Sequence, residues 1–168
     1  MESKETDGLA YLIHQRPMED SAVNMVRSDV TMRGISMKTF EQFGNAIEKV
    51  MGEASAIESF KILERHSNGM PKVGHMITKK IPFISQRENV LEIGWEDISE
   101  KQKFAFKRSI KRNDIPEKDN IIRIQMLSLQ LITEDGPDIK YTEFSNFNLG
   151  GMIPARLLNM AMARSVST

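Results

Sequence analysis

The sequence has 168 residues, of which 40% are hydrophobic, and this length fits one domain with a core of ordinary size. Lys and Arg (23) balance Asp and Glu (23), so the basic excess typical of nucleic-acid-binding proteins is missing. No cysteine is present, which excludes disulfides, Cys-ligated zinc and thiol catalysis. The polar residues 1–8 do not resemble a secretory signal, and no apolar run approaches the roughly 20 residues that span a bilayer. We therefore expect a cytoplasmic protein that is either soluble or touches membranes only at their surface.

Two strands and a helix are predicted in the first third of the chain. Residues 1–8 are polar and are predicted to be disordered. An apolar segment at 9–17 and an alternating segment at 22–32 favour two strands joined by a hairpin turn. Ser36 is suited to cap a helix, and apolar residues at helical spacing extend this helix to a stop near Gly52.

Six further strands and a C-terminal helix are predicted after the first helix. The strands are bounded by turn residues and lie at 60–64, 73–81, 88–95, 101–110, 121–132 and 139–147. Pro154 suits the first turn of a helix that runs from Ala155 to about residue 165. Consecutive strands with short turns indicate an antiparallel sheet, in a single domain over residues 9–168.

Short motifs in the second half of the chain occur in a characteristic order between Pro82 and Met162. Residues 85–90 read SQRENV, residues 121–123 read IIR, and residues 148–154 read NLGGMIP. In this order and spacing they resemble the motifs of START (StAR-related lipid transfer) domains, which belong to the helix-grip or Bet v 1-like superfamily. The match is incomplete, because the family usually has S-x-R-D-aromatic-V at the first motif and Asp at the start of the last one.

The resemblance implies an α+β helix-grip fold, in which a curved antiparallel sheet wraps around a C-terminal helix and encloses a hydrophobic cavity. It implies that this cavity holds one lipid, with the helix as a lid, and that a monomeric protein carries the lipid between membranes. Sterol-binding members have a charged pair in the cavity, and the corresponding positions here are Gly74 and Ile93. A phospholipid or another acyl lipid is therefore expected. The alternatives are a helix-grip enzyme or sensor of small hydrophobic ligands without transfer activity, or a module without a ligand.

The resemblance also implies a set of ligand-binding residues. They are Arg87, Leu91, Ile93, Phe104, Phe106, Arg123, Asn148, Met152, Leu157, Met160 and Ala161. Because side chains alternate along a strand, Arg87, Leu91 and Ile93 share one face. A guanidinium can hold a lipid phosphate or carboxylate in a bidentate manner. The alternative for Arg87 is an ion pair with Glu88 or Glu92, and the alternative for Arg123 is a charge at the edge of a strand.

Two roles are possible for several of the remaining candidate residues. Phe104 and Phe106 alternate with Ala105, so both rings point one way, into the cavity or into the core beneath it. Asn148 precedes two glycines and either caps the C-terminal helix or contacts the ligand. Met152 and the helix residues Leu157, Met160 and Ala161 would close the cavity, and Met152 and Met160 would also dip into a bilayer during lipid exchange.

Catalysis and metal binding have little support in the sequence. The three histidines lie on separate segments, without the spacing of a metal site. Neither a nucleophile elbow nor a Gly-rich phosphate loop is present. We therefore expect no cofactor, no nucleic-acid partner and no enzymatic activity. A basic cluster at Lys107, Arg108, Lys111 and Arg112 either attracts anionic head groups or is a solvated surface.

Overall fold

The computed structural model describes residues 2–6, 8–18, 21–49, 57–80 and 85–151, and for 2–6, 18, 21–24 and 45 it describes the backbone alone. The elements in chain order are β1 (Glu2–Thr6), β2 (Leu9–Met18), β3 (Ser21–Met32), α1 (Met37–Asn45), β4 (Ile57–Arg65), β5 (Pro71–Thr78), β6 (Gln86–Ser99), β7 (Gln102–Ser109), β8 (Ile121–Arg123), β9 (Gln125–Asp135) and β10 (Asp138–Asn148).

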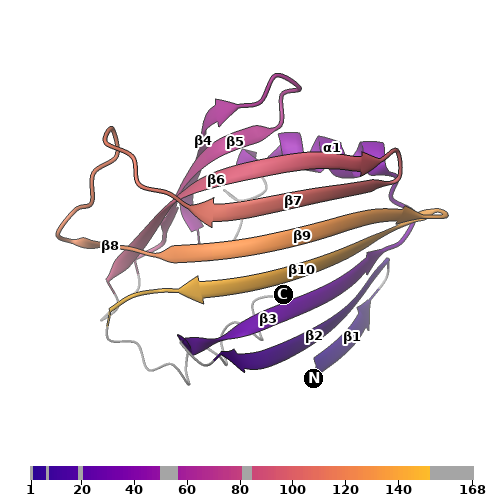
Figure 1. Cartoon of the computed structure of the whole chain (residues 1–168), viewed down its shortest axis with the longest axis horizontal. Helices are drawn as coiled ribbons and strands as arrows, with labels where there is room; N and C mark the ends of the chain where they lie inside the picture. Colours follow the sequence, from indigo (N-terminus) through magenta and orange to yellow (C-terminus); the bar gives the residue numbers. More distant parts are fainter. Residues whose placement is uncertain (1, 7, 19–20, 50–56, 81–84, 152–168) are drawn as a thin grey trace.

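The strands form one curved sheet of ten strands, in the order β1-β2-β3-β10-β9-β7-β6-β5-β4, with β8 beside β6 (Figure 1). The pairings along this order are antiparallel, which confirms the predicted sheet type. The N-terminal hairpin of β2 and β3 lies next to β10, the last described strand, so strands distant in sequence meet in the middle of the sheet.

Two predicted boundaries are wrong. Residues 1–8 are expected from their polarity to be disordered, but Glu2–Thr6 form β1, which pairs with the apolar strand β2. The single strand expected at 121–132 is split at Ile124, whose backbone N–H donates to Glu88 O at 2.9 Å. Before this break, β8 pairs with β6 in parallel, and after it β9 pairs with β7. Because of the break, one apolar segment pairs first with β6 and then with its neighbour β7.

Helix α1 begins where the sequence predicts. The Ser36 side chain accepts a hydrogen bond from the Thr39 backbone N–H at 3.2 Å, which confirms this residue as the N-cap. The helix ends at Asn45, and the stop expected near Gly52 lies outside the described residues. None of the helices in the described ranges is long and apolar enough to cross a membrane.

Helix α1 packs on one face of the sheet, which we call the inner face. Met37 of α1 is buried against Ala105, Ile132 and Ile139, with Met32, Ile35, Phe40, Trp95 and Tyr141 around this cluster. Lys103 of β7 also pairs with Glu41 of α1 at 2.8 Å. A second cluster contains Tyr11, Ile13 and Val26, with Val30, Phe147 and Leu149 around it. The opposite face of the sheet is called the outer face.

The C-terminal helix expected from Ala155 lies outside the described residues.

Candidate functional site

The strand register places a row of side chains across the middle of the inner face. Trp95 of β6 pairs with Ala105 of β7, which pairs with Gln130 of β9, which pairs with Glu143 of β10. Cross-strand partners point to the same face of a sheet, so these residues lie side by side. Leu91 and Ile93 lie on the same face of β6, and both are 4% exposed. The inner face therefore combines apolar and polar side chains.

The inner face of β6 contains three buried nitrogen atoms without a hydrogen-bond partner. They are Nε of Arg87, Nδ2 of Asn89 and Nε1 of Trp95. Arg87 is 6% exposed and Asn89 is fully buried. Leaving a buried donor unpaired costs about 1–3 kcal/mol, and more for a charged group. An acceptor from outside the protein chain would remove this cost.

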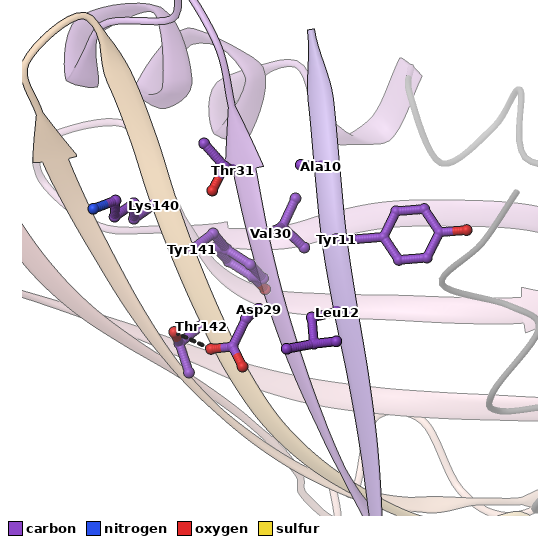
Figure 2. A pocket seen from close by; sticks show the side chains of 9 residues that line it. All are labelled: Ala10, Tyr11, Leu12, Asp29, Val30, Thr31, Lys140, Tyr141 and Thr142. Atoms are coloured by element: carbon purple, nitrogen blue, oxygen red, sulfur yellow. Dashed lines mark hydrogen bonds between the residues drawn. The ribbon is translucent and has the colours of Figure 1, made fainter. Parts of the chain in front are cut away.

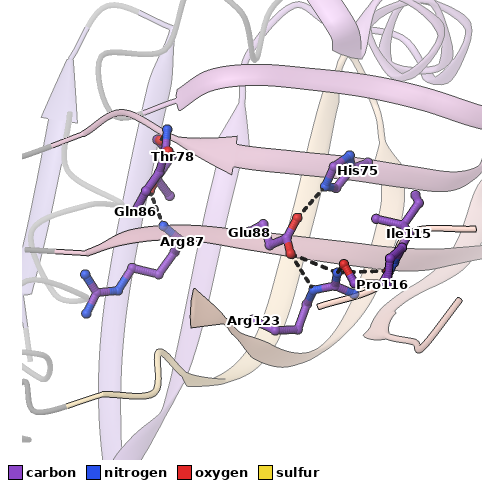
Figure 3. A network of polar contacts seen from close by, with 8 residues as sticks. All are labelled: His75, Thr78, Gln86, Arg87, Glu88, Ile115, Pro116 and Arg123. Atoms are coloured by element: carbon purple, nitrogen blue, oxygen red, sulfur yellow. Dashed lines mark hydrogen bonds and ion pairs between the residues drawn. The ribbon is translucent and has the colours of Figure 1, made fainter. Parts of the chain in front are cut away.

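Arg87 does not form the ion pair that was its alternative role. Among the described residues it has no carboxylate partner, because Glu88 bonds His75 and Arg123 while Glu92 bonds Arg108. Its Nη1 donates to the backbone oxygen of the neighbouring residue 85. Burial lowers the pKa of the Arg87 guanidinium, which reflects the cost of keeping this charge out of water. Figure 3 shows the guanidinium extending away from Glu88.

Glu88 points away from Arg87 and is the centre of a structural ion network. The carboxylate is fully buried, accepts a hydrogen bond from Arg123 Nη2 at 2.9 Å, and lies 3.0 Å from His75 Nε2 (Figure 3). Burial opposes its ionisation, but the hydrogen bonds from His75 and Arg123 outweigh this effect and hold the pKa of Glu88 below its usual range. Arg123 also donates to Ile115 O at 3.1 Å. The structure therefore gives Arg123 a bracing role between β8 and β6.

A second carboxylate, that of the half-buried Glu143, was missed by the sequence analysis. Tyr141 donates to it at 2.8 Å, Gln130 donates at 3.2 Å, and Ser128 donates as well. Burial opposes ionisation, but the charge of Lys107 and the hydrogen bonds outweigh it and hold the pKa of Glu143 below its usual range. Burial and the neighbouring Glu143 raise the pKa of Tyr141. The inner face thus carries an ionised acid near Lys107.

The strand β9 explains why this cluster was missed. Its sequence alternates Leu127, Leu129 and Leu131 with polar residues, and such a pattern normally places the leucines inside. The structure does the reverse: the three leucines are 50%, 40% and 39% exposed, whereas Ser128 and Gln130 are 0% and 3% exposed. The signal in the sequence was that Ser128 and Gln130 are two residues apart, which places them on one face of β9. The register between β9 and β10 is needed to see that Glu143 lies on the same face.

Phe104 and Phe106 do not share a face with Arg87, Leu91 and Ile93. Their neighbour Ala105 is fully buried on the inner face, so both rings lie on the outer face. The Phe106 ring covers Gly94, where an added Cβ would lie 2.0 Å from the ring. The prediction that these rings line the same cavity as Leu91 is therefore corrected. The physical reason is that alternation within one strand defines neither the register to the next strand nor which face is inner.

Asn148 forms a local Asx-type turn with the glycines that follow it, and the C-terminal helix that it was predicted to cap lies outside the described residues. The Asn148 Oδ1 accepts a hydrogen bond from the Gly150 N–H at 3.0 Å. Gly150 and Gly151 have φ of 60° and 71°, a conformation that favours glycine, and an added Cβ on either would lie 2.8 Å from Ile122. The other C-terminal candidates, Met152, Leu157, Met160 and Ala161, lie outside the described residues.

The predicted basic cluster is divided between the two faces. Lys107 lies on the inner face, because its cross-strand partner is Ser128. Arg108 lies on the outer face and forms an ion pair with Glu92 at 2.5 Å. Arg112 is held by Glu64 and Asp114, which raise the pKa of its guanidinium. In the described part of the chain no group of His, Cys, Asp or Glu has the arrangement of a metal site. The cluster is thus largely neutralised by local acids.

Residues of the described ranges line several hollows, of which three bear on the predicted site. The largest of these three, of about 810 Å³, lies at the start of β9 and brings together Arg123 and Asn148, two of the predicted residues. A hollow of about 240 Å³ contains Phe104 and Phe106. A third, of about 280 Å³, crosses β2, β3 and β10 (Figure 2).

The third hollow is braced by a hydrogen bond from Thr142 to Asp29 at 2.7 Å. The register places Leu12, Asp29 and Thr142 in one row on neighbouring strands, opposite the buried Tyr11 and Val26 cluster. This hollow therefore lies on the outer face, away from the unpaired donors of β6.

Comparison with solved structures identifies the type of fold. No protein-family model matches the sequence, and no curated protein matches it. The structure is similar to human STARD10, with a TM-score of 0.78, 12% identity, and coverage of 99% of this chain and 69% of that one. It is also similar to human StAR-related lipid transfer protein 5, with a TM-score of 0.74, 15% identity, and coverage of 98% of this chain and 79% of that one. A STAR-related lipid transfer protein from Xanthomonas axonopodis matches with a TM-score of 0.74 and 16% identity, and the match covers 96% of this chain and 89% of that one. The chain has a START-like fold.

Proposed function

We propose that residues 9–168 act as a single lipid-binding domain that holds one lipid against the inner face and carries it between membranes. The observation that carries this proposal is the set of unpaired donors on the inner face of β6, which lie beside Leu91 and Ile93. A lipid offers acceptor oxygens to such donors and apolar chains to such neighbours. Two of the structurally similar proteins are named as lipid transfer proteins, which supports the same function here.

The proposed ligand is a phospholipid or another acyl lipid, and the segment after Gly151 is the proposed lid. The charged pair of sterol-binding members is replaced by Gly74 and Ile93, which favours an acyl lipid over a sterol. We further propose that the protein is a cytoplasmic monomer that contacts membranes transiently and has no enzymatic activity. Exchange then occurs at a membrane surface, where the lid opens.

A transfer assay tests this function. Donor vesicles contain a self-quenched fluorescent phosphatidylcholine or phosphatidic acid, acceptor vesicles contain none, and transfer appears as a rise in fluorescence. We expect the protein to accelerate transfer of at least one of these lipids. If no acceleration occurs, and no lipid remains with protein that has been separated from the vesicles, the proposed function is wrong.

A pair of variants on one strand separates binding from nonspecific effects. Ile93 is 4% exposed on the inner face, whereas Ile98 of the same strand is 54% exposed. The larger side chain in Ile93→Trp would occupy the space proposed for the acyl chains, and Ile98→Trp would not. We expect the first variant to lose transfer and the second to retain it, with both folded by circular dichroism. Equal transfer by both variants would place the lipid elsewhere.

A further inference from the structure

We infer that Arg87 and Asn89 form a binding site for the anionic head group of the lipid, a phosphate or a carboxylate. The inference rests on the proposed function and adds to it the charge class of the ligand and the position of the head group. Of these two residues, the resemblance to START domains implies Arg87 alone as a ligand-binding residue, and it does not imply Asn89, which stands where that family usually has an aromatic residue.

The two side chains point the same way from β6. They are two residues apart on one strand, which separates their Cβ atoms by about 7 Å along the inner face. Arg87 is 6% exposed and Asn89 is fully buried, and each has a buried nitrogen without a partner. One oxyanion between them would accept hydrogen bonds from both, and such charge-assisted bonds are stronger than neutral ones.

The orientation of Asn89 is already fixed by its neighbours. Ser109 Oγ accepts a hydrogen bond from the Met126 backbone N–H at 2.8 Å, so its own proton is free to be donated. Ser109 Oγ lies 2.7 Å from Asn89 Oδ1 and donates to it. The amide nitrogen Nδ2 is therefore turned away from Ser109, as a donor that is not used within the protein. A ligand does not have to reorganise this side chain when it binds.

No acid of the described residues compensates the charge of Arg87. The nearest acid in sequence, Glu88, faces the other way and is occupied by His75 and Arg123. A buried ion without a counter-ion is costly, so an anionic ligand would gain the attraction without having to displace an internal partner. A neutral lipid would leave the guanidinium uncompensated.

The site lies where the chain leaves the sheet. An added Cβ on Gly151 would come within 3.7 Å of Arg87 Nη2, so the turn that follows β10 passes beside the guanidinium. Helix α1 covers the opposite end of the inner face, around Trp95 and Ala105. Trp95 is eight residues further along β6, about 27 Å from Arg87 in an extended strand. The head group would therefore sit near the C-terminal turn, with the acyl chains directed towards α1.

Matched ligands test the charge requirement. Dioleoyl phosphatidic acid and dioleoylglycerol share their acyl chains and differ in the phosphate, and oleate and methyl oleate differ in the carboxylate. Glycerol 3-phosphate has the phosphate without the chains. Binding is followed by the fluorescence of Trp95, the only tryptophan, which lies on the inner face. We expect each anionic lipid to bind about 10- to 100-fold more tightly than its neutral partner, and glycerol 3-phosphate to bind much more weakly than phosphatidic acid.

Variants assign this preference to the site. Arg87→Met should remove the difference within each lipid pair and leave the affinity for the neutral member within about twofold. Arg108→Met is the matched control, because Arg108 is an exposed arginine on the outer face, and it should retain the preference. Asn89→Asp keeps the acceptor for Ser109 and offers Arg87 an internal carboxylate. It should therefore weaken binding of the anionic lipids while raising the melting temperature.

The outcomes separate this inference from the proposed function. If wild-type protein binds both members of each pair equally, or if Arg87→Met weakens both equally, the anion site is refuted while lipid binding stands. If Arg87→Met does not fold, an unchanged preference in Asn89→Asp refutes the site by itself. Equal affinity for glycerol 3-phosphate and phosphatidic acid would mean a soluble anion as ligand and would overturn the head-group assignment. Absence of binding to every lipid would overturn both proposals.

Discussion

Replacing Glu88 with Gln should destabilise the protein strongly. The carboxylate is fully buried and holds two partners on different strands, His75 at 3.0 Å and Arg123 at 2.9 Å. The amide introduced by Glu88→Gln would keep the shape of the side chain but not its charge, so Arg123, whose side chain is 10% exposed, would remain as a buried cation. Removing one partner of a buried ion pair costs about 3–5 kcal/mol. This is a large part of the roughly 5–15 kcal/mol that separates folded from unfolded proteins.

The same network predicts a loss of stability in acid. The pKa of Glu88 in the folded protein is below its ordinary value of 4.5. A carboxyl group with a lowered folded pKa stabilises the folded state above its unfolded pKa, and this contribution disappears as the pH falls through the folded pKa. Stability of the wild type should therefore fall below pH 4.5, and the variant should show a shallower fall. Glu143, whose pKa is also lowered, would account for part of the slope that remains.

Urea unfolding measured between pH 7 and pH 3 tests both statements. Glu96→Gln is the matched control, because Glu96 is an exposed carboxylate on the same strand. We expect its free energy of unfolding to stay within about 0.5 kcal/mol of the wild type. A loss below about 1 kcal/mol in Glu88→Gln, or an equal loss in both variants, would refute the reasoning.

Further substitutions test the register and the two faces of the sheet. Gly94→Ala should cost about 1–3 kcal/mol, because its Cβ would lie 2.0 Å from the Phe106 ring. The cost should shrink in the Phe106→Ala background, and simple additivity in this double-mutant cycle would contradict the contact. Tyr141→Phe should cost about 1–3 kcal/mol by removing a donor to Glu143, as measured by urea unfolding. Leu129→Gln should change stability by no more than about 0.5 kcal/mol, because the side chain is 40% exposed on the outer face, and a loss above 2 kcal/mol would mean that this surface is covered.

The order of the elements was predictable, because local signals define it. The Ser36 cap, the turn residues and the alternation within each strand depend on neighbours in sequence. The split at Ile124 was not predictable, because it depends on a bond to Glu88 of another strand. Strand β1 was missed for a similar reason, since its partner β2 supplies the pairing that a polar segment lacks by itself.

The faces on which the candidate side chains lie were predicted in part. Alternation correctly grouped Arg87 with Leu91 and Ile93, and it correctly grouped Phe104 with Phe106, but it does not say whether the two groups share a face. The register between β6 and β7 decides this, and it places the groups on opposite faces. In the described part of the chain Arg87 has no acid as a partner, and the sequence did not reveal this, because Glu88 is adjacent along the chain but points to the other face.

Photo-crosslinking tests the central claim most directly. A phosphatidic acid with a photoreactive group near the end of one acyl chain is loaded from vesicles, irradiated and located by peptide mass spectrometry. We expect one lipid per protein and labelled peptides at inner-face residues such as Leu91, Ile93 and Trp95. Labelling confined to the exposed leucines of β9 at 127, 129 and 131, or no labelling by any lipid, would contradict a lipid held on the inner face.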